Sequence, residues 1–518
     1  MSYIIPSIVG LGPGETEPLT RNRLFSTLFA LGTALAVLVP HFANADPTSG
    51  AVPTFNVHDF GARGNGAALE THHLQNAIDA CACAGGGQVF FPAGHYRSGT
   101  LFLKSGVTLH LEKRAVLSAS RDLTDYPRVS PKLRSRTDNY TERSLIYGEG
   151  LQHIAIEGEG ILDGNGEAFF GPQLERPYLI RLVSCRDVSV SGITLRDAAM
   201  WSQHYLACDD VSINDVTVRS HRHLNNDGLD LDGCHRVTIT HCDIRSEDDA
   251  IVLKTTSNRS CRDVQISHCL LSSENNALKL GTESSAGFEN ISIHDCAIYD
   301  TKNSGLALEM VDGGKLDGVD VSNLAMRNVG APIFVRLGNR GRPVLPGAPK
   351  TRVGSLQNVH IRNIVATGAS RIGCSITGLP GSPASNISLE DIRITFAGGN
   401  AENGLHQTVA ERASKYPEHS MFGVLPAYGF YCRHVRGLTF SNVELDFQHA
   451  DARPSLVCDD VNGLDLNNWN GATRAATVQP VRLLNVTNAR FDKMPNRLAE
   501  KSPRSSDKKS SLPLDKAG

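Results

Sequence analysis

The sequence predicts an all-β protein folded as a right-handed parallel β-helix. Ten short segments alternate apolar and polar residues, which is the period of a β-strand. Six of them, from Val188 to Val319, follow one another at intervals of 23–28 residues with no helical pattern between the copies. One such repeat cannot bury its apolar face alone, but a stack of repeats can. The alternative, a β-propeller, would show a period of ~40 residues and blade signatures that the sequence lacks.

The first 45 residues have the pattern of a signal peptide with an N-terminal extension. Arg21 and Arg23 precede the apolar stretch 24–39, and small residues follow at Ala43 and Ala45. A charged, apolar, small-residue order is typical of a secretory signal, and the apolar stretch is short for a bilayer-spanning helix. We therefore expect cleavage after Ala45, a secreted or periplasmic protein, and no membrane association afterwards. The alternative is an uncleaved N-terminal anchor.

One helix is predicted over residues 71–85. Leu74, Ala77, Ile78 and Cys81 have helical spacing, and a run of three glycines ends the pattern. We expect this helix to cap the open N-terminal end of the solenoid, because an uncovered strand edge invites pairing with other chains.

The catalytic β-helix domain is expected to span residues 46–495. An aromatic-rich stretch around 400–428 breaks the repeat, which indicates a loop excursion beside a cleft. Tyr428 and Tyr431 are candidate sugar contacts in this region. Residues 496–518 are polar and charged, which predicts a disordered tail.

Charge and cysteine content narrow the class of function. The net charge is −3, whereas nucleic-acid-binding domains carry a basic excess, so no nucleic-acid partner is expected. Cys242, Cys269 and Cys296 recur every 27 residues in equivalent contexts. Free cysteine behaves as a small hydrophobe, so we expect a column of buried thiols there, and no disulfide can be assigned.

Two acidic turns occupy equivalent positions in neighbouring coils. Asp227 and Asp249 each lie two residues before an apolar strand centre, and Asp248 stands beside Asp249. Adjacent strands are ~4.8 Å apart, so the three carboxylates should meet in one groove. The aligned centres are Leu229, Ile251, Leu278, Leu306 and Phe334.

Three neighbouring carboxylates suit the hydrolysis of a glycosidic bond. Like charges raise the pKa of at least one carboxyl group, which keeps it protonated as a proton donor. Inverting glycosidases place their acid and base ~6.5–9.5 Å apart with a water between them. Asn-Asp-Gly and Glu-Asp-Asp are also ordinary turn sequences, but two such turns at the same coil position favour a site.

With these residues in place, the chain resembles glycoside hydrolase family 28, the polygalacturonase and rhamnogalacturonase group of pectin-degrading enzymes. The segment 55–112 is similar to the opening of pectin-active β-helix proteins. Asn225-Asn226-Asp227 stands where the family has Asn-Thr-Asp, and Asp248-Asp249 matches its Asp-Asp pair at the family's spacing. The resemblance extends over roughly 55–461.

The resemblance implies a mechanism and a substrate. Asp248 would be the general acid, Asp227 and Asp249 would activate water, and Asn226 would contact the sugar. The substrate would be a plant-type pectic polysaccharide, cleaved with inversion. No cofactor and no metal are implied, and we expect a monomer.

The sequence departs from the family where galacturonate is bound. The family's His position holds Asn276, and its Arg and Lys positions hold Ala307 and Glu309. An acid beside a substrate carboxylate is repulsive. Either other cations bind the carboxylate, with Lys279 and Arg336 as candidates, or the sugar at the cut is not galacturonate, as in rhamnogalacturonan or another decorated glycan. Asn276 and Glu309 remain candidate substrate contacts.

Three further residues are candidates for the cleft. Trp201 and His204 lie one coil before Asp227, where Trp201 would stack on a sugar and His204 would orient a carboxylate; core packing is the alternative for both. Lys254 follows the acid pair and would lower the pKa of a neighbouring acid; a solvated lysine is the alternative.

Other functions on this fold remain open at this point. A polysaccharide lyase would use Ca²⁺, which clustered aspartates could bind, with a basic residue to abstract a proton. A carbohydrate-binding β-helix would need no acid pair, and an epimerase is a third possibility.

Overall fold

A computed structural model of the chain describes residues 52–171, 175–400, 408–473 and 479–493. The predicted signal peptide (1–45) and tail (496–518) lie outside these residues, as does part of the 400–428 excursion. The N-terminal coils contain β1 (Thr54–Asn56), η1 (Val57–Phe60), β2 (Asn65–Leu69), α2 (Thr71–Cys83), β3 (Gly87–Phe91), β4 (Gly94–Ser98), β5 (Leu101–Phe102), β6 (Val107–Leu111), β7 (Ala115–Ala119), η2 (Leu123–Asp125), η3 (Arg136–Asn139), β8 (Ser144–Glu149), β9 (Gln152–Gly158), β10 (Ile161–Asp163) and η4 (Gly166–Phe169).

Among the described residues, every regular element of the central and C-terminal coils is a strand. The central ones are β11 (Tyr178–Val183), β12 (Arg186–Ser191), β13 (Thr194–Arg196), β14 (Gln203–Leu206), β15 (Asp209–Asn214), β16 (Thr217–Ser220), β17 (Leu229–Asp232), β18 (His235–Thr240), β19 (Asp243–Ser246), β20 (Ile251–Thr255), β21 (Cys261–Ser267), β22 (Leu270–Ser273) and β23 (Leu278–Ser284). The last are β24 (Phe288–Met310), β25 (Lys315–Leu337), β26 (Ser355–Ala369), β27 (Cys374–Thr377), β28 (Ala384–Gly398), β29 (Phe430–His449), β30 (Leu456–Gly471), β31 (Val481–Leu484) and β32 (Arg490–Asp492).

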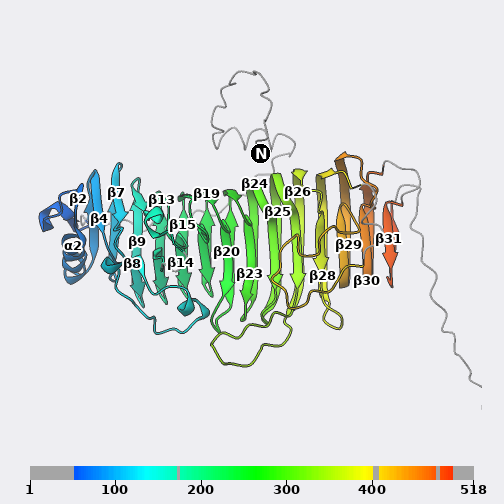
Figure 1. Cartoon of the computed structure of the whole chain (residues 1–518), viewed down its shortest axis with the longest axis horizontal. Coiled ribbons are helices and arrows are strands. Elements are labelled where there is room, and N and C mark those ends of the chain that lie inside the picture. The colour runs from blue at the N-terminus through cyan, green and yellow to red at the C-terminus, as the bar shows by residue number, and fades with distance from the viewer. Residues whose placement is uncertain (1–51, 172–174, 401–407, 474–478, 494–518) are drawn as a thin grey trace, which may run out of the picture. The chain divides into compact units, whose positions relative to one another are not determined.

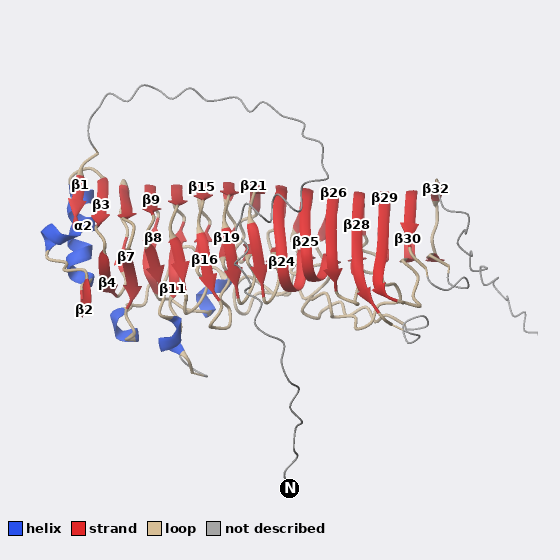
Figure 2. Ribbon diagram, turned by 90° about the horizontal axis from the view of Figure 1, so that it is seen from above, coloured by secondary structure: helices blue, strands red, loops and turns tan. Residues whose placement is uncertain are grey.

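The strands form a parallel solenoid with three strands to a coil. In the central coils each strand pairs in parallel with the strand three places later, so that β11 pairs with β14, β12 with β15 and β13 with β16. The coils follow one another along the horizontal axis in Figures 1 and 2. This confirms the predicted all-β, parallel architecture.

The core is a set of vertical columns of apolar side chains. Val188, Val211, Val237, Val264 and Ile291 are aligned in successive coils and are at most 2% exposed. Alternation along each strand directs these residues inward, and the constant repeat length puts like residues above one another. The free energy of burial therefore accumulates coil by coil.

The cysteines confirm the prediction of buried thiols. All 12 are free, and Cys242, Cys269 and Cys296 are each at most 1% exposed in the core. These three thiols fill the interior as small apolar groups.

The single α-helix predicted near the N-terminus is α2. Its buried face consists of Leu74, Ala77, Ile78 and Cys81, the residues whose spacing predicted it. The helix contacts β1, β3 and η1 and lies at the N-terminal end of the coils (Figure 2). No helix among the described residues is long and apolar enough to cross a bilayer.

One part of the sequence alignment was wrong by one residue. The predicted strand centres Leu229, Ile251, Leu278 and Leu306 are in register, but Leu306 pairs with Ile333 and not with Phe334. The register shifts between Thr301 and Ser304 in β24. Alternation alone does not reveal such an irregularity, because the pattern resumes after it.

Long connections leave the coils and return to them. One follows β7, one follows β25 and one follows β28 (Figure 1). Only the connection after β28 was predicted; its described residues, from 408 onward, carry Tyr416, whose hydroxyl lies 3.2 Å from Lys279 Nζ.

Candidate active site

A cleft of about 430 Å³ lies beside the acidic turns that the sequence singled out. The lining residues are Tyr140, Glu175, Arg176, Met200, Trp201, Asn225, Asp227, Asp248, Asp249, Lys254, Lys279, Glu283, Arg342 and Tyr416.

The structure brings Asp227, Asp248 and Asp249 together. One carboxylate oxygen from each lies within 4.8 Å of the others. Leu229 pairs with Ile251, so the turns before β17 and β20 are stacked. Gly228 permits this close stacking, because a Cβ there would lie 2.5 Å from the Ala250 carbonyl oxygen.

Asp248 is half-buried and held by amide groups. Its carboxylate accepts hydrogen bonds from Asn275 Nδ2 at 2.6 Å and Asn225 Nδ2 at 3.3 Å. Its backbone carbonyl accepts from the hydroxyls of Ser246 and Ser273, each at 2.6 Å. These contacts fix the carboxyl group at the cleft while leaving it open to a ligand.

Asp227 is buried against a lysine. Lys254 Nζ lies 3.4 Å from Asp227 Oδ2, 3.3 Å from Asp230 Oδ1 and 4.4 Å from the Trp201 ring centre. Burial raises the pKa of Asp227 well above its ordinary value, with Asp230 and Asp248 adding to the rise and Lys254 opposing it. Burial likewise raises the pKa of Asp230 to about 8 against the opposing ammonium. Lys254 is therefore the group that favours ionised Asp227.

Asp249 has its own lysine. Lys279 Nζ donates to Asp249 Oδ2 at 2.9 Å, and Asn276 Nδ2 donates to the other oxygen at 2.8 Å. Lys279 Nζ also lies 3.8 Å from Glu309 Oε2 and 3.2 Å from the Tyr416 hydroxyl. Asn276 and Glu309, predicted as substrate contacts, thus lie behind Asp249 and support it.

Glu283 and Arg342 are further charged residues in the cleft lining. Burial raises the pKa of Glu283, but Lys254, Arg342 and Arg340 together hold it below the ordinary value. Arg342 is ion-paired with Glu283, and Arg340 with Asp312. Since Glu283 stays ionised, it supplies Lys254 with a third carboxylate, 3.9 Å away.

Besides Asn276 and Glu309, three predicted site residues lie outside the cleft lining: His204, Asn226 and Arg336. His204 is fully buried with Nε2 3.3 Å from Asp232 Oδ2, and burial lowers its pKa to about 4 although Asp232 opposes this. It supports the Trp201 ring, 5.1 Å away. Asn226 is buried and donates to the carbonyls of residues 198 and 200. Both residues therefore shape the cleft from behind.

Arg336 is turned away from the cleft. It is 1% exposed and donates to Thr377 Oγ1, the Gly378 carbonyl and the Glu411 carbonyl. The sequence suggested a cation for the substrate, but the excursion after β28 covers this guanidinium and uses its donors.

The prediction that Tyr428 and Tyr431 contact sugar is not supported by their positions. Tyr428 is fully buried, its hydroxyl donating to the Leu445 and Ala472 carbonyls. Tyr431 is 3% exposed in an apolar cluster with Ala307. The excursion's cleft contact is instead Tyr416, which is 48% exposed.

Sequence reasoning missed the residues that reach the cleft from outside the repeat. They are Tyr140, Glu175, Arg176, Arg342 and Tyr416, from the connections after β7, β10, β25 and β28. Clusters of aromatic and basic residues outside the repeat could have indicated that these connections line a cleft. Such clusters do not show which part of the solenoid a connection covers.

Glu309 should make stability depend on pH. Burial, with Asp249, raises its pKa from 4.5 to about 8 despite Lys279. The folded protein therefore holds a proton that the unfolded chain releases, and the free energy of unfolding falls as the pH rises through this window. Glu309→Gln should flatten this fall by up to about 1.4 kcal/mol per pH unit, as measured by urea unfolding between pH 5 and 8.

The matched control is Glu159→Gln, since Glu159 lies on the surface with its side chain 70% exposed. It should leave the pH dependence unchanged. Equal pH slopes for Glu309→Gln and the wild type would contradict a protonated Glu309.

The comparison with protein families can now be set against this geometry. The model of the family Glycosyl hydrolases family 28 matches residues 81–413, more than half of the 518-residue chain. The chain belongs to glycosyl hydrolases family 28. The resemblance read from Asp227, Asp248 and Asp249 is confirmed at the level of the family.

Two relatives whose names state an activity match parts of this family 28 chain. A protein named "Probable polygalacturonase" from Vitis vinifera is 34% identical over 214 residues, covering 38% of this chain and 43% of its own length. An exo-poly-alpha-D-galacturonosidase of Dickeya chrysanthemi is 38% identical over 128 residues, covering 23% of this chain and 21% of its own length. The chain thus spans less than half the length of these relatives.

Solved structures share the fold of this family 28 chain. The hyperthermoactive exopolygalacturonase from Thermotoga maritima superposes with a TM-score of 0.59 at 22% identity, over 66% of this chain and 87% of that one. At that identity the likeness concerns the fold.

Proposed function

We propose that this family 28 protein hydrolyses glycosidic bonds in pectic polysaccharide of the galacturonan or rhamnogalacturonan type. The observation that carries the proposal is the asymmetry among three carboxylates within 4.8 Å of one another. Asp227 and Asp249 each contact a lysine ammonium, whereas Asp248 contacts neutral amides at the cleft. Within the described part of the chain, Asp248 therefore differs from Asp227 and Asp249 in having no lysine ammonium among the contacts of its carboxylate.

The asymmetry supports a division of roles. Asp248 donates a proton to the leaving oxygen, because it is the least enclosed of the three. Asp227 and Asp249, which contact the ammonium groups of Lys254 and Lys279, accept hydrogen bonds from a water and take its proton as the water attacks the sugar carbon. General acid–base assistance of this kind contributes about 10²–10⁴-fold to the rate.

The stereochemical outcome tests this assignment. A spacing within 4.8 Å is shorter than the ~6.5–9.5 Å usual for an inverting pair and near the ~5–5.5 Å of a retaining pair. We nevertheless propose inversion, because lysine contacts weaken Asp227 and Asp249 as nucleophiles while leaving them able to hold water. Proton NMR of the first product should show the inverted anomer; retention would contradict the proposed roles.

The substrate carboxylate would be bound by other groups than the family's Arg and Lys. Ala307 packs under Phe422 and Leu425 of the excursion, which closes that position. Arg176, Arg342 and Tyr416 line the cleft instead, so uronate carboxylates and sugar faces both have partners.

One digestion panel tests the function. Polygalacturonate, rhamnogalacturonan and a neutral glycan are incubated with the protein, with and without EDTA, and reducing ends and ultraviolet absorbance are recorded. We expect new reducing ends from a pectic polymer and no effect of EDTA. We expect no new ultraviolet absorbance, because a hydrolase leaves no conjugated double bond in its product. Absorbing products or EDTA inhibition would favour a calcium-dependent lyase, and release from no polymer would favour a binding protein.

The proposal also includes the domain bounds, the oligomeric state and the location of the protein. We infer that residues 46–495 form one right-handed β-helix domain capped by α2, acting as a monomer outside the cytoplasm after removal of residues 1–45. The packing of α2 on β1 and β3 supports the cap, and right-handed crossovers between parallel strands are the rule.

A further inference from the structure

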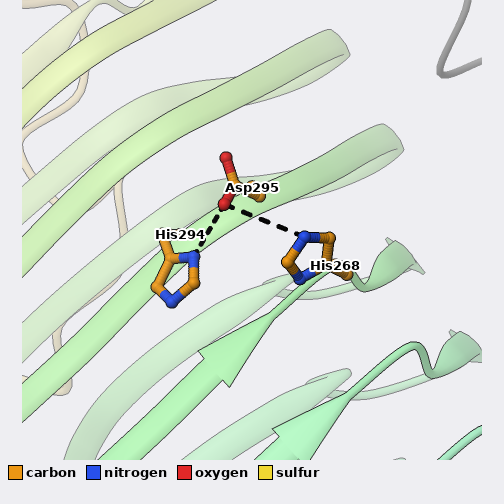
Figure 3. A group of neighbouring side chains, drawn as sticks. All are labelled: His268, His294 and Asp295. Carbon is orange, nitrogen blue, oxygen red and sulfur yellow. Dashed lines mark hydrogen bonds and ion pairs between the residues drawn. The ribbon is translucent and has the colours of Figure 1, made fainter. Parts of the chain in front are cut away.

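A cluster of metal-ligating side chains lies on the turns after β21, outside the cleft. His268 directly follows β21, and His294 and Asp295 belong to the next coil in β24. Ser267 pairs with His294, which places His268 opposite Asp295. Figure 3 shows both imidazoles directed toward the Asp295 carboxylate.

The ligand atoms converge on a small volume. His294 Nδ1 lies 2.8 Å from Asp295 Oδ2, and His268 Nε2 lies 3.9 Å from the same oxygen. One atom from each residue lies within 4.8 Å of the others. The side chains are 46%, 26% and 32% exposed for His268, His294 and Asp295, so an ion can enter from solvent.

Neighbouring groups hold these ligands in place. Asn323 Nδ2 donates to Asp295 Oδ1 at 2.8 Å, which leaves Oδ2 facing the imidazoles. Gln265 Nε2 lies 3.1 Å from His294 Nε2, and the His241 ring stacks on His268 with centroids 5.1 Å apart. Such outer contacts orient metal ligands and strengthen binding.

We propose that His268, His294 and Asp295 bind one divalent transition-metal ion, with Zn²⁺ as the representative. Two imidazole nitrogens and a carboxylate oxygen suit Zn²⁺, whereas Ca²⁺ requires an all-oxygen site. Bonds of ~2.0–2.2 Å need only small movements of the side chains from their present separations. The ion would join two successive coils on the outer surface, so it would bind the folded state and raise Tm. This inference does not depend on the proposed function.

The backbone offers variants that should keep the fold. His268, Asp295 and Asn323 occupy one column of left-handed residues, with φ of 55° at each. Because asparagine fits this conformation well and already stands at 323, His268→Asn and Asp295→Asn remove ligands without new strain. His153→Asn, at φ 53° with its side chain 71% exposed, is the matched control, because it makes the same replacement in the same backbone conformation without touching the three ligands.

Titration calorimetry with ZnCl2 on the full chain tests the proposal, with circular dichroism confirming that each variant is folded. The wild type and His153→Asn should bind Zn²⁺ and gain Tm, and CaCl2 should give neither effect. His268→Asn and Asp295→Asn should each weaken binding about 10-fold or more and lose the Tm gain. Zn²⁺ affinity and Tm gain equal to wild type in both ligand variants, or no binding by the wild type at millimolar Zn²⁺, would overturn it.

Discussion

Replacing Asp248 by asparagine should lower kcat on the pectic substrate by about 10²–10⁴-fold. Asparagine keeps the oxygen that accepts from Asn275 Nδ2 at 2.6 Å, so the side chain stays in place while losing its transferable proton. We expect KM to change little, because the proton is needed only in the transition state. Steady-state kinetics on the polymer identified by the digestion panel give both constants.

The chain offers a matched control for this variant. Asp459-Asp460 is a second acid pair, and Asp460 has φ of 55° with its side chain 63% exposed. Asp460→Asn should keep kcat within about twofold, since asparagine suits the left-handed conformation. A loss below tenfold in Asp248→Asn, with a correctly folded protein, would remove Asp248 from the role of general acid.

Replacing Lys254 by methionine should destabilise the fold by about 3–5 kcal/mol above pH 8, where Asp230 is ionised in the wild type. The ammonium lies within 3.4 Å of both Asp227 and Asp230, and all three side chains are nearly inaccessible to solvent. Without it, two buried carboxylates face each other with no cation between them. The loss should shrink as the pH falls below about 8, because Asp230 then takes up a proton instead of remaining charged. Urea unfolding at pH 9 and at pH 6 measures this.

A double-mutant cycle identifies the cause. Asp230→Asn removes one of the two charges, so adding it to Lys254→Met should recover about 0.5–3 kcal/mol. Lys104→Met is the control, because Lys104 forms a surface ion pair with Asp79 at 3.7 Å, and such pairs contribute at most about 1 kcal/mol. Additive effects of the Lys254 and Asp230 changes would show that the buried cluster is not a unit.

The two kinds of experiment separate chemistry from structure. The side chain of Asp248 makes polar contacts with amide groups, whereas Lys254 stabilises the fold through two buried carboxylates and opposes the rise in the pKa of Asp227. Lys254→Met should therefore lower both stability and activity, and Asp248→Asn activity alone.

The sequence was sufficient to predict the solenoid, the inward apolar columns and the meeting of Asp227 with Asp249. These features depend on alternation and on a nearly constant repeat length, both visible in the chain itself. Cys242, Cys269 and Cys296 were predicted as buried thiols for the same reason. Where the register shifts, near Thr301, the alignment failed by one residue, since alternation resumes beyond the shift.

The tertiary structure alone decided what surrounds the three carboxylates. Lys279 was expected to meet a substrate carboxylate and is held by Asp249, while Arg336 is covered by the excursion and Tyr416 reaches the cleft instead. The repeat determines how the coils stack, because the residue that lies next to a given residue in the adjacent coil is one repeat length away in the sequence. The connections after β7, β25 and β28 have no such period, so their paths follow from side-chain packing and charge pairing that exist only in the folded chain.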